Sequence, residues 1–223
     1  MAESPRARFK PTVRARRADY TVRRHPHAET APFIVTHHYA QGTANTSTES
    51  FGLFRGPNLV GAALWMPPTK VCAKSIDPFD WERVICLSRL AIVPGEPTNA
   101  ASLFIGGMLR TLNTERRWTC CVTYADESQA HTGTIYRATN WQYLGPTRAE
   151  PRWEDAEGRQ VSRLSTKTRR VKTMSELGFR MVGKYRKHKF ARIFDIGLAC
   201  CFVRMGSAIV GSDTTPARMS RKE

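Results

Sequence analysis

The chain has 223 residues, of which 41% are hydrophobic, so it can bury the core of one ordinary domain and carry extensions beside it. It contains 35 Lys and Arg residues against 19 Asp and Glu residues, which gives a formal net charge of +16. The longest apolar run, Ile196–Val203, is far shorter than the roughly 20 residues of a membrane-spanning helix. We therefore expect no membrane role.

The positive charge is concentrated in two segments. Residues 1–30 carry eight basic and three acidic side chains, residues 159–192 carry twelve and one, and residues 31–158 carry eleven and twelve. A near-neutral body between two cationic segments fits a polyanionic partner, and a basic surface without a partner is the alternative. We expect a mobile basic arm at 1–30, one domain at 31–195 and an extension at 196–223.

Apolar stretches between turn signals predict the order of elements. The longest are a strand over 83–93 and a helix over 98–113, in which Leu, Phe and Met recur at helical spacing. Gly56-Pro57 indicates a hairpin between strands at 51–54 and 59–66. The other expected elements are strands at 33–36, 118–124, 141–144, 160–164 and 190–194, helical segments at 131–139 and 174–178, and a polar surface loop at 146–158.

The start of the helix at 98–113 is a candidate anion site. Thr98 or Asn99 can cap it, and the first backbone N–H groups of a helix have no partner within the helix. Such an end suits a phosphate or pyrophosphate. The candidate cofactor-binding residues are Asn99, Ala100, Ala101 and Ser102; for Ser102 the alternative is simple helix capping.

The stretch Tyr124–Gly145 holds more reactive side chains than a turn needs. Those of Asp126, Glu127, Ser128, Gln129 and His131 follow directly on the strand at 118–124. Functional groups often stand on loops that a rigid element positions. We expect Asp126 to accept a proton or to orient an amine, and a structural Asp is the alternative. We expect the Ala-His-Thr-Gly stretch at 130–133 only to position the short helix that follows.

Six cysteines include two adjacent pairs, Cys120-Cys121 and Cys200-Cys201, and no Cys-x-x-Cys. Neighbouring residues of a strand face opposite sides, so neither pair easily supplies two ligands to one metal. With no signal peptide in view, a reduced cytosolic protein with buried thiols is the favoured interpretation.

Strand, turn and helix at 84–112, followed by strand, elbow, short helix and strand at 118–145, resemble the core of the GNAT acyltransferase fold. The resemblance implies an α+β domain with a mixed, mostly antiparallel central sheet flanked by helices, here with basic N- and C-terminal extensions. It also implies that Tyr136, which precedes Asn140-Trp141, is a general acid. The glycine-rich phosphate loop of that fold is replaced by Thr98–Ser102, which puts a coenzyme A donor in doubt.

More specifically, the chain is similar to the Mom DNA-modification proteins of bacteriophages over residues 33–194. The stretches that carry this similarity are His38-Tyr39, Met66–Thr69, Leu87–Leu90, Asn99–Ser102 with Phe104–Gly106, Tyr124–Glu127, Gly133–Thr139 and Gly158–Gln160. The similarity implies conversion of adenine in double-stranded DNA to N6-carbamoylmethyladenine, which shields phage DNA from host restriction, in the cytoplasm of the host bacterium.

The chemistry of that product favours glycyl-tRNA as donor, with acyl-coenzyme A as the alternative. An adenine amine inside a duplex is reached by extruding the base, for which Tyr39, Trp65 and Phe54 are stacking candidates that are more often ordinary core residues. From their positions we expect His38, Tyr39, Asp126, Tyr136 and Ser102 to be catalytic residues and Arg89 to bind the donor. His38 could act as a base or metal ligand and pair with Asp126; a structural histidine is the alternative, and for Tyr136 the alternative is a packed aromatic residue. The resemblance also implies iron (Fe²⁺), with His38 and Asp126 as ligands, although two ligands fall short of a recognisable site.

Basic residues of 159–192 are expected to contact DNA phosphates, which position the protein without reading sequence. They are Arg163, Lys167, Arg169, Arg170, Lys172, Lys184, Arg186, Lys187, His188 and Lys189. Two other functions stay open: an acyltransferase of the same fold that acts on a protein or small amine, and a non-catalytic nucleic-acid-binding protein.

Overall fold

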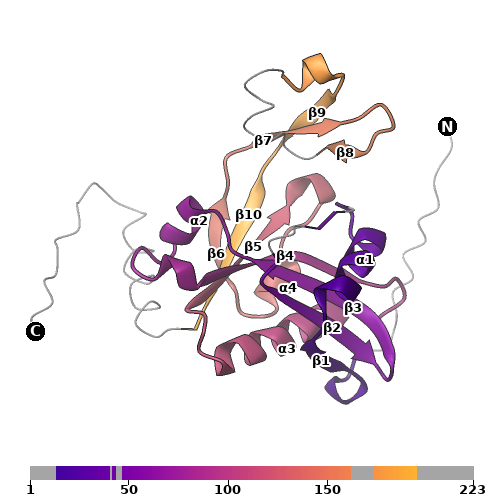
Figure 1. The fold of residues 1–223 in the computed structure, drawn as a ribbon, viewed down its shortest axis with the longest axis vertical. Coiled ribbons are helices and arrows are strands. Elements are labelled where there is room, and N and C mark those ends of the chain that lie inside the picture. The colour runs from indigo at the N-terminus through magenta and orange to yellow at the C-terminus, as the bar shows by residue number, and fades with distance from the viewer. Residues whose placement is uncertain (1–13, 41, 44–46, 162–172, 195–223) are drawn as a thin grey trace, which may run out of the picture.

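The body of the protein is a seven-stranded sheet with strand order β1-β2-β3-β4-β5-β10-β6 (Figure 1). The computed structural model describes residues 14–40, 42–43, 47–161 and 173–194. Its strands are β1 (Thr21–Arg24), β2 (Glu49–Arg55), β3 (Asn58–Met66), β4 (Val84–Ile92), β5 (Cys120–Asp126), β6 (Gln142–Pro146) and β10 (Lys187–Ile193). All neighbours are antiparallel except β4 and β5. The predicted fold class, a mixed and mostly antiparallel sheet flanked by helices, is confirmed.

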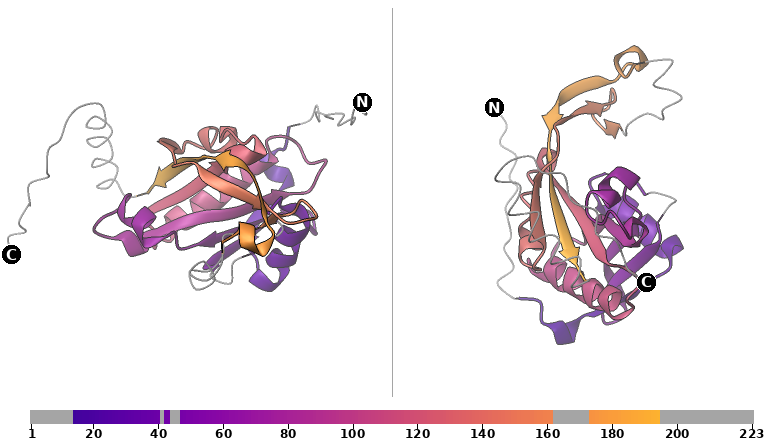
Figure 2. Two further views of the ribbon diagram at one scale, coloured as in Figure 1. Left: turned by 90° about the horizontal axis from the view of Figure 1, so that it is seen from above. Right: turned by 90° about the vertical axis from the view of Figure 1, so that its left-hand side faces the viewer.

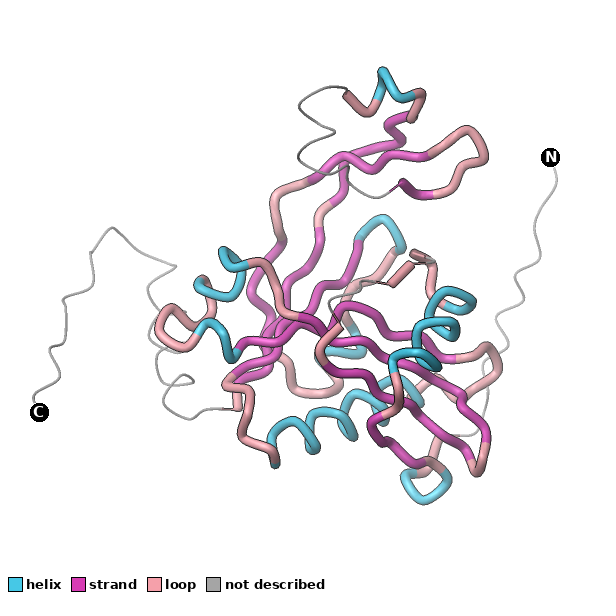
Figure 3. Tube along the Cα trace, in the orientation of Figure 1, coloured by secondary structure: helices cyan, strands magenta, loops and turns pink. Residues whose placement is uncertain are grey.

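In the described residues, four α-helices pack around this sheet (Figure 3). They are α1 (His27–His37), α2 (Lys70–Lys74), α3 (Ala100–Thr114) and α4 (Thr134–Arg137). The predicted hairpin and the long strand and helix that follow it correspond to β2, β3, β4 and α3. The helix expected at 131–139 is shorter, since only 134–137 are helical. No helix in the described part of the chain is long and apolar enough to cross a membrane.

Alternate residues of the strands build two cores, one on each face of the sheet. Trp65 and Cys121 face α3 and α4, whereas Leu64 packs with α1 and Cys120 packs with α2. The period of two is the ordinary consequence of strand geometry. As expected, the adjacent thiols of Cys120 and Cys121 therefore lie on opposite faces.

The N-terminal region differs from the expectation. Residues 14–30 were predicted to be a mobile arm, but they hold the short helix η1 (Arg17–Asp19), strand β1 and the start of α1. Val22 of β1 packs on Gly107 of α3, where any side chain would collide with it. The strand predicted at 33–36 is wrong, because these residues belong to α1 and the β-branched Ile34 fills the core between α1, β3 and β4.

A second, three-stranded sheet with order β8-β7-β9 projects from the body (Figure 2). It contains β7 (Glu150–Glu154), β8 (Gln160–Val161) and β9 (Arg180–Tyr185), with the turn η4 (Ser175–Leu177) at its outer end. The surface loop predicted at 146–158 is therefore wrong for 150–154. Only Arg186 separates β9 from β10, so one nearly continuous segment joins the two sheets.

Candidate active site

The centre of the main sheet is split. β4 and β5 pair only up to Leu87 and Thr123, where the Thr123 hydroxyl donates to the Leu87 carbonyl oxygen over 3.1 Å. Beyond this point β4 continues beside β3, and β5 continues beside β10. A bulge at Ser88 interrupts the register with β3, and bulges of this kind bend a strand and redirect its side chains. The strands therefore open a wedge between them.

A cavity of about 330 Å³ fills this wedge, and we call it the inner cavity. Its walls are formed by β4 and β5, by the segment after α1 on one face of the sheet, and by residues 130–133 and α4 on the other face. Its lining consists of His38, Tyr39, Leu87–Leu90, Tyr124, Ala125 and Ala130–Tyr136.

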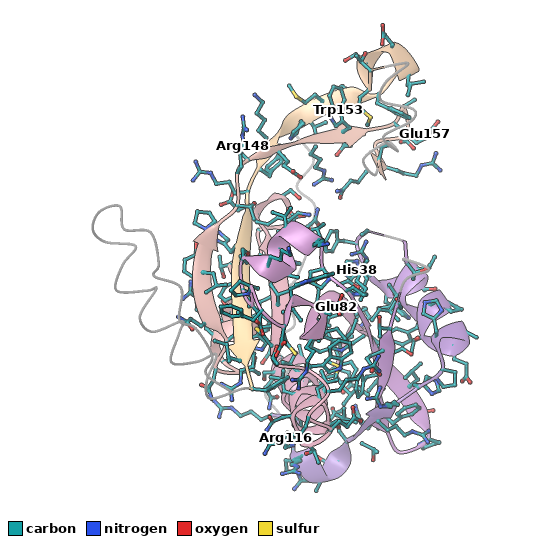
Figure 4. All side chains as sticks on the ribbon, turned by 60° about the vertical axis from the view of Figure 1, so that its left-hand side comes forward. His38, Glu82, Arg116, Arg148, Trp153 and Glu157 are labelled. Carbon is teal, nitrogen blue, oxygen red and sulfur yellow. The ribbon has the colours of Figure 1, made fainter. Side chains whose placement is uncertain are left out.

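A second cavity of about 330 Å³, the outer cavity, lies between the body and the small sheet. It is lined by Tyr39, Ala40, Gly42, Thr43, Arg89, Asp126, Ser128, Glu150–Arg152, Gln160, Val161, Tyr185 and Lys187. Tyr39 and Arg89 line both cavities, so they stand where the two meet. Figure 4 shows the small sheet, with Trp153, overhanging the part of the body that carries His38.

His38 and Tyr39 follow directly on the last turn of α1. The His38 ring nitrogen Nδ1 accepts a hydrogen bond from the Ala40 N–H over 3.1 Å. Burial, with the nearby Arg89 and His131, lowers the pKa of His38 to about 4, so its imidazole is neutral at physiological pH. The Tyr39 ring lies 4.3 Å from that of His38 and is 42% exposed. Burial and the charge of Asp126 raise the pKa of Tyr39 to about 12.

Asp126, at the end of β5, is a buried carboxylate that lines the outer cavity. Its Oδ1 accepts a hydrogen bond from the Ser128 N–H over 2.9 Å and so caps the turn η3 (Glu127–Gln129). The structural role that the sequence left open is therefore present. The predicted pairing with His38 is not found among the hydrogen bonds and ion pairs of the described residues, and the two side chains line different cavities.

Tyr136 lines the inner cavity from α4 and is 8% exposed. Its ring packs 5.3 Å from Phe190 and 5.7 Å from Trp141, and burial raises the pKa of its phenol. The elbow before it lines the same cavity. The prediction that 130–133 only position the helix is therefore incomplete, since the His131 ring also lies 5.8 Å from that of Tyr39.

The start of α3 does not line either cavity. The Asn99 side chain instead forms two hydrogen bonds with the N-terminal segment. Its Oδ1 accepts from the Ala15 N–H over 2.8 Å, and its Nδ2 donates to the Ala15 carbonyl oxygen over 3.0 Å. The Ser102 hydroxyl donates to the Asn99 carbonyl oxygen over 2.9 Å, a bond within the first turn that does not cap the free N–H groups of α3. Ala100 is in the core. Of the predicted donor-binding residues, the structure brings only Arg89 to the cavities, where its Nε donates to the Gly42 carbonyl oxygen over 3.1 Å.

The five described residues among those predicted to bind DNA have different surroundings. Lys184 and Arg186 are exposed, and Lys187 lines the outer cavity. His188 pairs with Glu127 over 3.3 Å, and the Lys189 ammonium donates to the Ser75 hydroxyl over 3.0 Å. The other five, Arg163, Lys167, Arg169, Arg170 and Lys172, lie outside the described residues.

The residues present do not fit a metal centre. Within the described ranges, no group of three or more His, Cys, Asp or Glu side chains is placed to hold a metal ion. Nδ1 of His38 and Oδ1 of Asp126 each already accept a backbone hydrogen bond. Burial raises the pKa of Cys86 and of Cys120 to about 12, so these thiols stay protonated.

Two of the three stacking candidates are core residues, which was the alternative stated in the sequence analysis. Trp65 is fully buried and Phe54 is 6% exposed, so only Tyr39 is accessible at the cavities. Sequence reasoning missed Arg152 and Tyr185 in the outer cavity because it missed the strands that carry them. It also gave no role to Ser88, although Leu87–Leu90 is one of the stretches that carry the Mom similarity.

Comparison with known proteins finds similar solved structures and a matching family. The chain is similar to an N-acetyltransferase from Staphylococcus aureus (8% identity, 79% of this chain and 99% of that chain, TM-score 0.49). It is also similar to a mutant spermidine N-acetyltransferase from Vibrio cholerae (11% identity, 79% of this chain and 95% of that chain, TM-score 0.49). A third similar structure is a GNAT family acetyltransferase from Elizabethkingia anophelis with acetyl-CoA bound (10% identity, 78% of this chain and 98% of that chain, TM-score 0.47).

The family assignment rests on a match over most of the chain. Residues 19–194 match the Mom protein family, and the chain belongs to that family. No curated protein matches the chain.

Proposed function

We propose that the protein transfers an aminoacyl group to the N6 amine of adenine in duplex DNA, to yield N6-carbamoylmethyladenine and protect phage DNA from host restriction. The observation that carries the proposal is that a member of the Mom protein family has two adjoining cavities with complementary acid and base groups. One holds the buried carboxylate of Asp126, and the other holds the buried phenol of Tyr136.

The proposed reaction has two steps and starts from a glycyl ester. First, adenine N6 attacks the ester carbonyl carbon, the ester C–O bond breaks, and one proton passes from N6 to the leaving ribose oxygen. Next, the free amine of the glycyl group attacks C6 of the purine and the C6–N6 bond breaks. One proton moves from the attacking amine to the departing amide nitrogen, which leaves a carbamoylmethyl group on the new exocyclic nitrogen. Neither step needs an oxidant or a reductant.

The side chains divide these proton transfers. Asp126 accepts the proton from N6, and Tyr136, whose raised pKa keeps it protonated, supplies a proton to the leaving oxygen. His38 is a neutral imidazole because burial lowers its pKa to about 4, and it lines the inner cavity, whereas Asp126 lines the outer one. We therefore assign it a hydrogen-bonding role toward the donor in the inner cavity, in place of the general-base role suggested by sequence. Arg89, which lines both cavities, stabilises negative charge on the reacting carbonyl oxygen.

We favour glycyl-tRNA over acyl-coenzyme A as the donor. Asn99 at the start of α3 is engaged by the backbone of Ala15, so this helix end is partly covered by the protein itself. The carbons of the product also correspond to a glycyl group. An acetyl-coenzyme A donor is the alternative.

Mass analysis of nucleosides from DNA of cells that express the chain tests the reaction and the substrate together. We expect N6-carbamoylmethyladenine with the unchanged protein and none with Asp126→Asn, which keeps the Oδ1 acceptor and removes the charge. Asp80→Asn is the matched control, because Asp80 is an exposed carboxylate outside both cavities. Absence of a modified base with the unchanged protein would contradict the proposal and favour a protein or small amine as acceptor.

The donor is tested with purified protein, duplex DNA and labelled glycine. We expect label in the modified base when glycyl-tRNA is supplied and no modification with acetyl-coenzyme A alone. Modification that carries no glycine label would exclude the proposed donor.

A further inference from the structure

Arg152 of β7 is a side chain with an unmet hydrogen-bonding requirement. Its guanidinium donates to the Ser128 carbonyl oxygen over 3.4 Å and pairs with Glu154 over 3.1 Å. Its Nε is buried, and within the described part of the chain this N–H has no hydrogen-bond partner. A buried donor without an acceptor is costly and rare in folded proteins. The structure therefore points to an acceptor that comes from a ligand.

The ligand space beside Arg152 is the outer cavity, whose walls mix cationic and aromatic groups. Arg89, Arg152 and Lys187 line it together with Tyr39 and Tyr185. The acidic lining residues are Asp126 and Glu150. Three cations against two carboxylates, together with two phenol rings, match a molecule that is anionic at one end and flat and aromatic at the other.

We propose that the outer cavity binds a single adenine nucleotide extruded from DNA, with its phosphate on Arg152 and its base beside Tyr39. The inference rests on the proposed function and assigns its two reactants to separate cavities. Asp126, the proton acceptor for N6, lines the outer cavity, whereas Tyr136, the acid for the ester oxygen, lines the inner one. The nucleotide therefore enters between the two sheets, and the aminoacyl end enters the wedge between β4 and β5.

The two reactants then meet at Tyr39 and Arg89, which line both cavities. Tyr39 is 42% exposed and already lies beside the rings of His38 and His131, so its free face is available to a base. The Nε–H of Arg152 can donate to the phosphate beside the bonds that the terminal nitrogens make to Ser128 and Glu154, a geometry that a lysine cannot reproduce.

Binding of free nucleotides to the full-length protein tests this assignment without requiring transfer. Titration calorimetry with deoxyadenosine monophosphate and with deoxyadenosine separates the phosphate contribution from the base contribution. We expect the monophosphate to bind more tightly. Arg152→Gln should weaken the monophosphate about tenfold, as for loss of one charge-assisted hydrogen bond, and should leave deoxyadenosine unchanged.

Arg148→Gln is the matched control, because Arg148 is an exposed arginine that precedes the same strand and does not line the outer cavity. Arg152→Lys keeps the charge and should recover less than half of the lost affinity. Since Arg152 also pairs with Glu154, thermal unfolding of each variant is recorded, and the lysine variant serves if the glutamine variant does not fold. Equal monophosphate affinity in the Arg152 variants and the Arg148 variant would overturn the assignment.

Two further outcomes separate the cavity from the reaction. If adenosine monophosphate binds and its deoxy form does not, the cavity takes the terminal nucleotide of an RNA and the inference is wrong. If Arg152-dependent binding of the deoxynucleotide is found in a protein that leaves no modified adenine in DNA, the cavity assignment stands and the proposed function fails.

Discussion

Gly133 provides the sharpest test of the packing behind the inner cavity. It precedes α4 with a φ of +78°, and a Cβ at this position would lie 2.2 Å from the fully buried ring of Phe190. In Gly133→Ala the left-handed backbone costs about 1–2 kcal/mol. Displacement of a ring in a filled core costs about 1–3 kcal/mol more. We expect a total loss of about 2–5 kcal/mol, measured as a lower urea midpoint at an unchanged slope.

Gly145→Ala separates the two contributions. Gly145 also has a positive φ, +94°, but no atom lies within 4 Å of a Cβ built there, so only the backbone cost remains. The entropy gained by adding a methyl group to the unfolded chain is the same in both variants and cancels in the comparison. Because Phe190 packs on Tyr136, Gly133→Ala should also lose transferase activity. Equal destabilisation of the two variants would refute the packing argument.

Three more outcomes are expected. The pKa of His38 is lowered from 6.5 to about 4, so only the unfolded state takes up this proton as the pH falls from 6.5 to 4. The free energy of unfolding, measured by urea titration at each pH, should therefore drop by up to about 3 kcal/mol over this range, and by less in His38→Gln. Lys184→Gln with Arg186→Gln should weaken DNA binding on all sequences and reduce the salt slope by about 1 per residue; an unchanged slope would remove both from the DNA contact. Asn99→Ala removes two hydrogen bonds to Ala15, which lowers the stability of the attachment of this segment by about 1–3 kcal/mol. Trypsin should therefore cleave the chain on the N-terminal side of β1 faster than in the unchanged protein.

The middle of the fold was predictable because its elements bury long apolar patterns. The stretch from β2 to β5 contains the largest buried side chains, such as Trp65 and Phe104, and their spacing carries the strand and helix periods. Phe33–Thr36 was mistaken for a strand because β-branched residues favour extended structure in isolation. Burial of Ile34 against the sheet outweighs that preference. The helix forms even though Pro32 lies inside it.

Of the small sheet, β8 and η4 fall within the strand predicted at 160–164 and the helical segment predicted at 174–178, whereas β7 and β9 were not predicted, since they contain no buried residue. Without a buried face there is no alternation of apolar and polar residues to read. The same gap explains why Arg152 was missed: Asp126 was expected from its place after a strand, and Tyr39 and Tyr136 from the family resemblance, while Arg152 becomes visible only when β7 folds over the cavity.

The exposed strands of the small sheet have a consequence for folding. Three short strands with no buried side chain are marginal by themselves, so this sheet depends on the backbone that it shares with β6 and β10. A ligand held between the sheets adds the contacts that the small sheet lacks. Part of the binding free energy then appears as added stability of β7, β8 and β9, and hydrogen exchange in these strands should slow more on nucleotide binding than exchange in the main sheet.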